Sequence, residues 1–366
     1  MRVTFPHMGY MHIPLKAMLE YLGLEVIVPP PITKKTLTLG VKYSPEFACL
    51  PLKLNVGNFI EAYEAGADTI VMAGGCGPCR FGYYAQVEHA ILSELGCRYQ
   101  LIVLEPPQKH AGELLAKIKK LAGKNSWRRV VEAIRFGYML ARALDEVEKA
   151  SFWSRPRELV PGSTDRALSK AIDILCRVSS PREVKSARES ALQLMSSVPV
   201  DAGKAVLKVG VVGEIYTVLE PFANLHLQRA LGLLGVEVDR SIYLSEWIND
   251  HLFLGLLKNM RSSKEYCRAA QPYLCHFVGG HGQESVGGAV YYARSGMSGV
   301  IQVFPFTCMP EIVAGTILLA VSEDFDLPVM KLIVDEHTAE TGLITRLEAF
   351  VDLLGRRKGY KEASGL

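Results

Sequence analysis

Four of the eight cysteines in this 366-residue chain stand in short motifs beside glycine or proline. Cys76 and Cys79 form the tetrapeptide Cys-Gly-Pro-Cys, while Cys49 and Cys308 each stand two residues before a proline. Eight cysteines are too few and too irregularly spaced for a disulfide scaffold. In a reducing cytoplasm, clustered cysteines point to metal binding or redox chemistry. The positions of these thiols are therefore the first question.

Three of these sites, at Cys49, Cys79 and Cys308, fall where a helix is predicted to begin. Backbone N–H groups and the helix dipole stabilise negative charge there, which favours a lowered thiol pKa and offers donors to sulfur ligands. Ligands of open α/β sheets bind at the carboxyl ends of the strands. Two such domains facing each other would bring these loops to one cleft.

A competing interpretation treats Cys76 and Cys79 as a redox dithiol, because the same tetrapeptide is the thioredoxin active-site motif. Gly75 precedes the motif here, where a thioredoxin usually has tryptophan, and the chain is far larger than a thioredoxin. Cysteines without any ligand are a further alternative. The remaining cysteines are interpreted as small, mainly buried apolar residues, with Cys275 retained as a weak candidate: Cys97, Cys176, Cys267 and Cys275.

Short β-branched runs alternate with helical patterns in the first part of the chain, which predicts a parallel sheet with crossover helices. A second series of the same kind begins near residue 208. Between them, apolar residues recur at helical spacing and no strand is expected. The sequence predicts an α/β protein with two Rossmann-like or flavodoxin-like domains joined by a helical connector. The boundaries are 1–107, 108–204 and 205–366.

A faint internal repeat accompanies this division. Residues 21–26 read Tyr-Leu-Gly-Leu-Glu-Val and residues 234–238 read Leu-Gly-Val-Glu-Val, so that in both a glycine would end a helix before the next strand. The match favours two related domains but is common in α/β proteins.

Composition excludes several classes of function. The chain has 41 basic and 38 acidic residues, a formal net charge of +3, which does not indicate nucleic-acid binding. No stretch approaches the roughly 20 apolar residues of a membrane span, and no signal-peptide pattern opens the chain. We expect a cytoplasmic protein that binds neither nucleic acid nor membrane.

The motifs taken together resemble the 2-hydroxyacyl-CoA dehydratase and benzoyl-CoA reductase-like superfamily, and most closely its stand-alone activase-related (CoA protein activase) members. The resemblance spans nearly the whole chain and rests on these segments: Phe5-Pro6-His7-Met8-Gly9, Tyr43-Ser44-Pro45-Glu46-Phe47-Ala48-Cys49, Gly77-Pro78-Cys79-Arg80, Gly213-Glu214-Ile215-Tyr216, Glu220-Pro221-Phe222, Gly279-Gly280-His281-Gly282, Phe306-Thr307-Cys308-Met309-Pro310-Glu311 and Asp335-Glu336-His337-Thr338.

By this resemblance, Cys49, Cys79 and Cys308 are expected to hold a [4Fe-4S] iron–sulfur cluster in the interdomain cleft. Cys76 is the nearest candidate for a fourth ligand. A double cubane is less favoured, because the second domain lacks a clear set of three cysteines. The resemblance implies anaerobic, low-potential electron transfer or reductive activation of a small substrate or acyl-CoA. An ATP-dependent activator, an electron donor protein, a partner subunit or a homodimer would serve as partner.

Activators of such systems are ATPases, but this chain has no P-loop pattern and no other recognised ATPase motif. We therefore do not expect ATP hydrolysis. His7, Glu214 and His337 follow strand-like or loop segments and are candidate catalytic residues, each with a purely structural alternative. Two other functions stay open: a thiol–disulfide oxidoreductase using Cys76 and Cys79, and a non-catalytic cluster carrier or scaffold.

Overall fold

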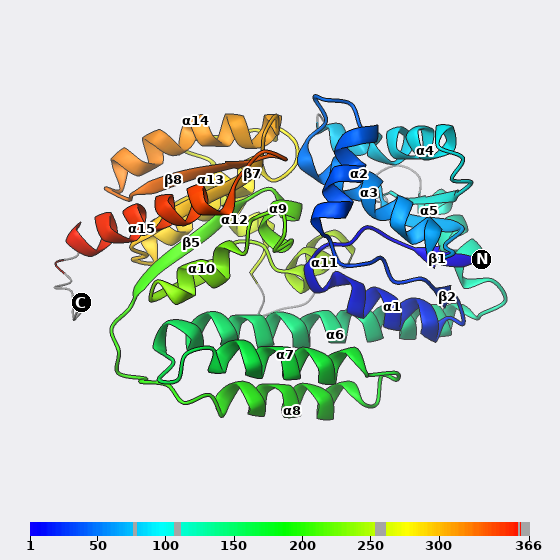
Figure 1. Cartoon of the computed structure of the whole chain (residues 1–366), viewed down its shortest axis with the longest axis horizontal. Coiled ribbons are helices and arrows are strands. Elements are labelled where there is room, and N and C mark those ends of the chain that lie inside the picture. The colour runs from blue at the N-terminus through cyan, green and yellow to red at the C-terminus, as the bar shows by residue number, and fades with distance from the viewer. Residues whose placement is uncertain (76–78, 106–110, 253–260, 358, 360–366) are drawn as a thin grey trace.

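A computed structural model describes residues 1–75, 79–105, 111–252, 261–357 and 359. It contains two α/β domains side by side, with a helical segment along one side of both (Figure 1). In the first domain, four strands alternate with helices: β1 (Arg2–Thr4), α1 (His12–Tyr21), β2 (Glu25–Val26), α2 (Lys34–Tyr43), α3 (Leu50–Glu64), β3 (Thr69–Ala73), α4 (Tyr84–Glu94) and β4 (Gln100–Leu104). Short 3₁₀ turns, Gly9–Met11 and Arg80–Tyr83, precede α1 and α4.

The second domain repeats this alternation. Its elements are β5 (Leu207–Gly213), α9 (Ile215–Leu219), α10 (Leu227–Leu233), β6 (Val236–Arg240), α11 (Leu244–Leu252), α12 (Ser263–Ala270), α13 (Gly282–Arg294), β7 (Gly299–Pro305), α14 (Met309–Asp324), β8 (Val329–Val334) and α15 (Glu340–Arg357).

Both sheets are parallel throughout and share one strand order. The first runs β2-β1-β3-β4 and the second β6-β5-β7-β8. Each therefore has the 2-1-3-4 order that begins a flavodoxin-like sheet, and the predicted α/β class is confirmed. Because the same order recurs, the carboxyl ends of β1 and β3 in one domain correspond to those of β5 and β7 in the other.

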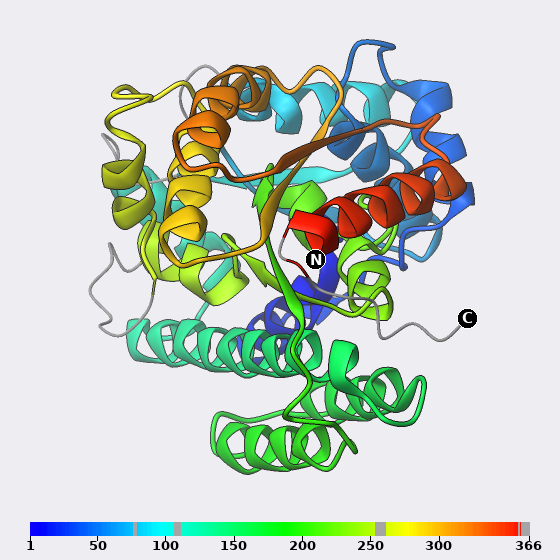
Figure 2. The same ribbon diagram turned by 90° about the vertical axis from the view of Figure 1, so that its left-hand side faces the viewer.

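The segment between the domains is helical, with α5 (Ala111–Ala122), α6 (Trp127–Ser154), a 3₁₀ turn (Arg155–Arg157), α7 (Ser163–Cys176) and α8 (Val184–Ser196). Helix α5 packs on β4, whereas α6 contacts α1 of the first domain and α11 and β6 of the second. Helices α7 and α8 stack on the outer side of α6, away from both sheets (Figures 1 and 2). Long α6 thus spans both domains and fixes one against the other.

Local sequence signals explain several helix ends. Gly23 and Gly235 have φ of +83° and +80°, the left-handed conformation in which glycine ends a helix. These are the two glycines of the sequence repeat: Gly235 directly precedes β6, and one residue separates Gly23 from β2. Thr33 forms a capping box with Thr36 at the start of α2, and Ser126 caps α6.

Glycines also permit close helix crossings in both domains. A Cβ at Gly57 of α3 would clash with the backbone carbonyl of Thr36 in α2, and one at Gly287 of α13 would clash with that of Tyr266 in α12. The two α-helical hairpins beside the sheets are therefore built on the same backbone-to-backbone contact.

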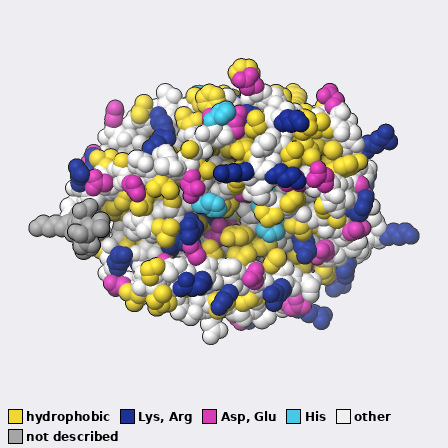
Figure 3. Space-filling model, in the orientation of Figure 1, with side chains coloured by type: hydrophobic (Ala, Val, Ile, Leu, Met, Phe, Trp, Pro, Cys, Tyr) yellow, Lys and Arg dark blue, Asp and Glu magenta, His cyan; other side chains and the backbone are white. Residues whose placement is uncertain are grey.

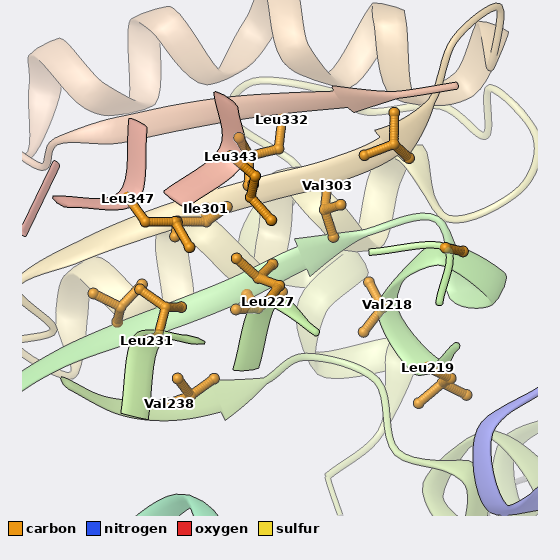
Figure 4. Close-up of a cluster of buried hydrophobic side chains, with 14 of the residues drawn as sticks. Val218, Leu219, Leu227, Leu231, Val238, Ile301, Val303, Leu332, Leu343 and Leu347 are labelled. Carbon is orange, nitrogen blue, oxygen red and sulfur yellow. The ribbon is translucent and has the colours of Figure 1, made fainter. Parts of the chain in front are cut away.

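The largest hydrophobic core lies in the second domain, between β5, β7, β8 and helices α10 and α15 (Figure 4). Val218 and Leu219 of α9 extend it toward the first domain, where Ile32, Leu50 and Leu54 join the same cluster. The domains thus share continuous apolar packing. Basic, acidic and hydrophobic side chains intermingle on the surface seen in Figure 3. Within the described part of the chain, no helix is long and apolar enough to cross a membrane.

Candidate functional site

Cys49 is the N-cap of α3, with Pro51 in the first turn of that helix. Its thiol is 9% exposed and contacts the hydroxyl of Tyr84, the first residue of α4. Burial raises the pKa of the Cys49 thiol to about 12, against a smaller lowering by the Tyr84 hydroxyl. This thiol is protonated at neutral pH unless a cation replaces its proton.

Cys79 is the N-cap of the 3₁₀ turn that leads into α4 and is partly buried. Burial raises its pKa, while the backbone N–H of Phe81 lowers it by a smaller amount. A Cβ added to Gly280, which precedes α13 in the second domain, would lie 4.0 Å from the Cys79 sulfur. The thiol therefore stands at the seam between the two domains.

Cys308 is the N-cap of α14, directly after β7, with Pro310 in the first turn. The side chain is 9% exposed, and burial raises the pKa of its thiol. Glu214, Glu311 and Cys49 raise this pKa further, whereas the backbone N–H of Glu311 lowers it. The predicted placement at helix N-termini is confirmed for Cys49 and Cys308, whereas Cys79 caps the 3₁₀ turn that precedes α4.

The guanidinium of Arg80 ties the three cysteine loops together. Arg80 follows Cys79, and its Nη1 donates to the carbonyl of Phe47 at 3.0 Å, two residues before Cys49. Its Nη2 donates at 2.8 Å to both the carbonyl and Oγ1 of Thr307, the residue before Cys308. Thr307 has φ of +69°, which is rare for a β-branched residue and marks local strain. One side chain thus links loops from both domains.

Glu214 stands at the centre of the electrostatics. Its negative charge raises the pKa of all three thiols, Cys49, Cys79 and Cys308. Its oxygens accept 2.9 Å bonds from the backbone N–H groups of Tyr216 and Thr217, which makes it the N-cap of α9. Burial raises the pKa of Glu214 despite these bonds.

Burial has a larger effect on the pKa of the three thiols than the helix N-termini have, which the sequence interpretation did not anticipate. Helix N-termini do lower the pKa of these cysteines, but the loss of water around the sulfur outweighs that effect and the net shift is upward. The expected lowering of the thiol pKa is therefore wrong for the thiols as they stand. Cys76 lies outside the described residues.

His7 follows β1 and is buried, with its Nδ1 3.1 Å from Oε2 of Glu220 in the second domain. The same Oε2 accepts a 2.7 Å bond from the backbone N–H of Gly9. The ring of His7 stacks on that of His12, with 5.3 Å between their centroids. His7 therefore takes part in an interdomain contact, and no recorded interaction joins it to the three thiols within the described ranges.

His337 is exposed, and its backbone N–H donates to Asp335 at 3.0 Å, as in a turn. The preceding residue, Glu336, instead forms an ion pair with Lys53, one helical turn after Cys49. Lys53 is 2% exposed and also donates to the carbonyl of Glu46 at 3.0 Å. The structure thus brings Glu336, not His337, to the interdomain seam.

His281 is the N-cap of α13 and lines a small pocket of about 30 Å³ with residues of α11 and α12. Burial lowers the pKa of its imidazole to about 4, so the ring is neutral at pH 7. The residue before it, Gly280, is the one that approaches Cys79.

Large apolar side chains are exposed on the loops that carry the thiols. Phe47 is 76% exposed, Tyr83 74% and Phe306 58%, and each lies within four residues of Cys49, Cys79 or Cys308. Exposed aromatic residues concentrated around one site are typical of a surface that another molecule covers. We call these three residues the aromatic rim.

The described side chains are not spaced to coordinate a single metal ion. Across the residues that the structure describes, no group of three or more His, Cys, Asp and Glu side chains is arranged to hold one ion. The loops that carry Cys49, Cys79 and Cys308 nevertheless meet through Arg80, and each of these cysteines caps a helix or 3₁₀ turn. The three thiols are soft donors of the kind that iron–sulfur clusters use.

Several residues of the site were not singled out from the sequence as functional. Tyr84, Lys53 and Glu220 act through contacts with residues 35, 283 and 213 positions away in the chain. Arg80 was named only as part of the segment Gly77-Pro78-Cys79-Arg80. A helical signal places Tyr84 at the start of α4, but nothing local indicates that its hydroxyl meets Cys49.

Comparison with protein families matches residues 7–240 to the family described as CoA enzyme activase uncharacterised domain (DUF2229). The match begins at the loop after β1 and ends with β6, so it includes Cys49, Cys79 and Glu214 but not Cys308. A search of curated proteins gives no match.

Proposed function

The chain belongs to the CoA enzyme activase uncharacterised domain family, and from that premise we propose that it is an iron–sulfur protein for low-potential electron transfer. Cys49, Cys79 and Cys308 would hold a [4Fe-4S] cluster between the two domains. The observation that carries the proposal is that Arg80, beside Cys79, hydrogen-bonds to Phe47 and Thr307, so the loops that carry the three thiols meet across the two domains.

The buried thiols support a metal-bound state. Each has a pKa raised by burial, so its thiolate form is unfavourable without a nearby cation. Coordination by iron replaces the proton and removes that penalty. In an iron–sulfur cluster the thiolates bind different iron atoms. The ligands can therefore lie farther apart than the ligands of a single metal ion.

The chain's own residues would tune the bound group. Backbone N–H groups of Leu52, Phe81 and Glu311 favour the thiolate forms of the three cysteines, and Arg80 favours those of Cys49 and Cys79. Hydrogen bonds and positive charge near sulfur raise the reduction potential of such sites, whereas Glu214 would lower it. When bound, the cluster supplies one-electron chemistry.

Three protein ligands leave one coordination position for Cys76 or for a small substrate or acyl-CoA. The family description supports a relation to CoA enzymes, and the aromatic rim supports docking of an electron donor or activator protein. Glu214 is the acid–base candidate whose charge acts on all three thiols. His7 and His337 stay predictions, since their recorded contacts belong to an interdomain pair and a turn.

Thiol–disulfide exchange is less well supported. It would use only Cys76 and Cys79, and it leaves unexplained why the loops of Cys49 and Cys308 meet at Arg80 beside Cys79. The test is reduction by dithionite of protein prepared anaerobically with iron and sulfide, followed by electron paramagnetic resonance. We expect a half-integer-spin signal from one electron per chain, absent in Cys79→Ala. Iron-containing protein that accepts no electron would contradict the electron-transfer role.

A further inference from the structure

Tyr84, the first residue of α4, is a buried tyrosine whose hydroxyl contacts the sulfur of Cys49. Its side chain is 6% exposed and belongs to the same apolar cluster of the first domain as Cys49 and Leu52. The ring also packs edge-on against that of Phe81, with 5.6 Å between the ring centroids. This packing fixes the hydroxyl of Tyr84 beside the sulfur.

The direction of this hydrogen bond depends on whether Cys49 carries its proton. A phenol hydroxyl can donate or accept, and so can a thiol, whereas a thiolate only accepts. In a metal-bound thiolate the proton of Cys49 is absent, so Tyr84 is then the donor. A hydrogen bond to an ionised acceptor is shorter and roughly twice as strong as one between neutral groups. The contact between Tyr84 and Cys49 is therefore stronger with a bound metal than in metal-free protein.

The three thiols differ in the groups that donate to them. Among the described residues, the sulfurs of Cys79 and Cys308 accept hydrogen bonds from backbone N–H groups, those of Phe81 and Glu311. In the same part of the chain, the sulfur of Cys49 has a side-chain hydroxyl beside it as well as a backbone donor. Tyr84 thus makes Cys49 chemically distinct from the other two thiols.

We propose that Tyr84 raises the reduction potential of the thiol site by donating a hydrogen bond from its hydroxyl to the sulfur of Cys49. The inference rests on the proposed function, because it takes Cys49 as a ligand. One-electron reduction places more negative charge on the ligand sulfurs, so a donor at Cys49 stabilises the reduced form. The hydroxyl of Tyr84 keeps its proton in both oxidation states.

The hydrogen bond is tested first without metal, by infrared spectroscopy of the S–H stretch in reduced protein. The band that is lost in Cys49→Ala belongs to Cys49. Tyr84→Phe should shift this band, because phenylalanine keeps the ring and removes only the hydroxyl. Tyr99→Phe is the matched control and should not, because Tyr99 is also 6% exposed in the same cluster but donates to the carbonyl of Phe59 at 2.7 Å. An identical Cys49 band in wild type and Tyr84→Phe would overturn the hydrogen bond.

The second measurement uses iron-loaded protein, with dithionite as the one-electron donor and electron paramagnetic resonance as the readout. Tyr84→Phe should lower the midpoint potential, by about a tenfold change in the ratio of oxidised to reduced protein, which is about 59 mV for one electron. Tyr99→Phe should leave the potential unchanged. Equal potentials in wild type and Tyr84→Phe would refute the tuning role.

A third variant decides the matter if Tyr84→Phe does not fold. Site-specific 3-fluorotyrosine in place of Tyr84 keeps the ring and the hydroxyl, and the fluorine makes that hydroxyl more acidic and a stronger donor. The potential should then rise above that of wild type, and an unchanged or lower potential would contradict the proposal. If no iron binds, the proposed function fails, whereas the metal-free infrared measurement still decides whether Tyr84 and Cys49 are hydrogen-bonded.

Discussion

The two α/β domains have the same strand order but carry different chemistry at equivalent places. After the third strand of each sheet stands a cysteine that caps a helix or turn, Cys79 after β3 and Cys308 after β7. The helix that leads into that strand is capped by Cys49 in the first domain and by His281 in the second. The same arrangement of strands and helices thus supplies two thiols from the first domain and one from the second.

This difference shows that the site forms where the two domains meet and not within either domain alone. Arg80 reaches from the first domain to Thr307 in the second, and Glu336 reaches back from the second to Lys53. A repeat that had stayed symmetrical would place a thiol at residue 281. Instead the imidazole there faces a separate small pocket.

The largest expected effects come from substitutions at the two close helix crossings, α2–α3 and α12–α13. Gly57→Ala and Gly287→Ala would each drive a Cβ into a backbone carbonyl that cannot rotate away. We expect each to lower the free energy of unfolding by about 4 kcal/mol, measured by denaturant titration. Gly342→Ala, at an exposed position of α15 with open space around it, is the control and should raise stability by up to about 1 kcal/mol. Unequal losses at Gly57 and Gly287 would break the structural equivalence of the two hairpins.

The seam is tested next by its buried ion pair. Lys53→Met leaves the carboxylate of Glu336 without its partner in a position only 15% exposed, and should cost about 3 kcal/mol. The exposed pair Arg128–Glu132 on α6 is the comparison, and Arg128→Met should change stability by less than about 0.5 kcal/mol. Similar small effects for both variants would show that Lys53 and Glu336 do not hold the domains together.

The helices after the third strands each bury one carboxyl, Glu88 on α4 and Glu311 on α14, with pKa raised by burial to about 8 and about 7. A folded-state pKa above the unfolded value means that the group's contribution is complete below about pH 4.5 and is lost as pH rises to the folded pKa. We expect metal-free protein to lose about 5 kcal/mol through Glu88 and about 3 kcal/mol through Glu311 over that range.

Denaturant titrations between about pH 5 and pH 9 check this expectation. Glu88→Gln should be more stable than wild type at the upper end of the range and should lack the loss that continues to about pH 8. Glu311→Gln should lack the loss of stability that wild-type protein completes about one pH unit lower, near pH 7. Identical pH profiles in wild type and both variants would contradict ionisation of these buried carboxyls.

Much of the scaffold was predictable because its signals are local. Apolar β-branched runs mark the strands, and glycine or proline marks the turns, so the α/β class and the capping positions of Cys49, Cys79 and Cys308 follow from short segments. The gathering of these cysteines required a resemblance as well, since no local pattern brings residues 49 and 308 together.

The remaining features of the site depend on burial and on contacts between distant residues. The sequence places a thiol at a helix N-terminus, but only packing decides that desolvation outweighs the helix and raises its pKa. The pairings of Tyr84 with Cys49 and of Glu220 with His7 likewise arise when separate elements meet. Neither the thiol pKa values nor these pairings could be predicted from residues that are adjacent in the sequence.

The most direct test of the central claim is the iron and acid-labile sulfide content of protein made under anaerobic, iron-replete conditions. The account predicts about four of each per chain in wild type and in Cys176→Ala, whose cysteine is exposed on α7. It predicts loss of both in Cys49→Ala, Cys79→Ala and Cys308→Ala, because ligands from both domains are required. Wild-type protein without iron, or iron retained in Cys308→Ala, would contradict a cluster shared between the domains.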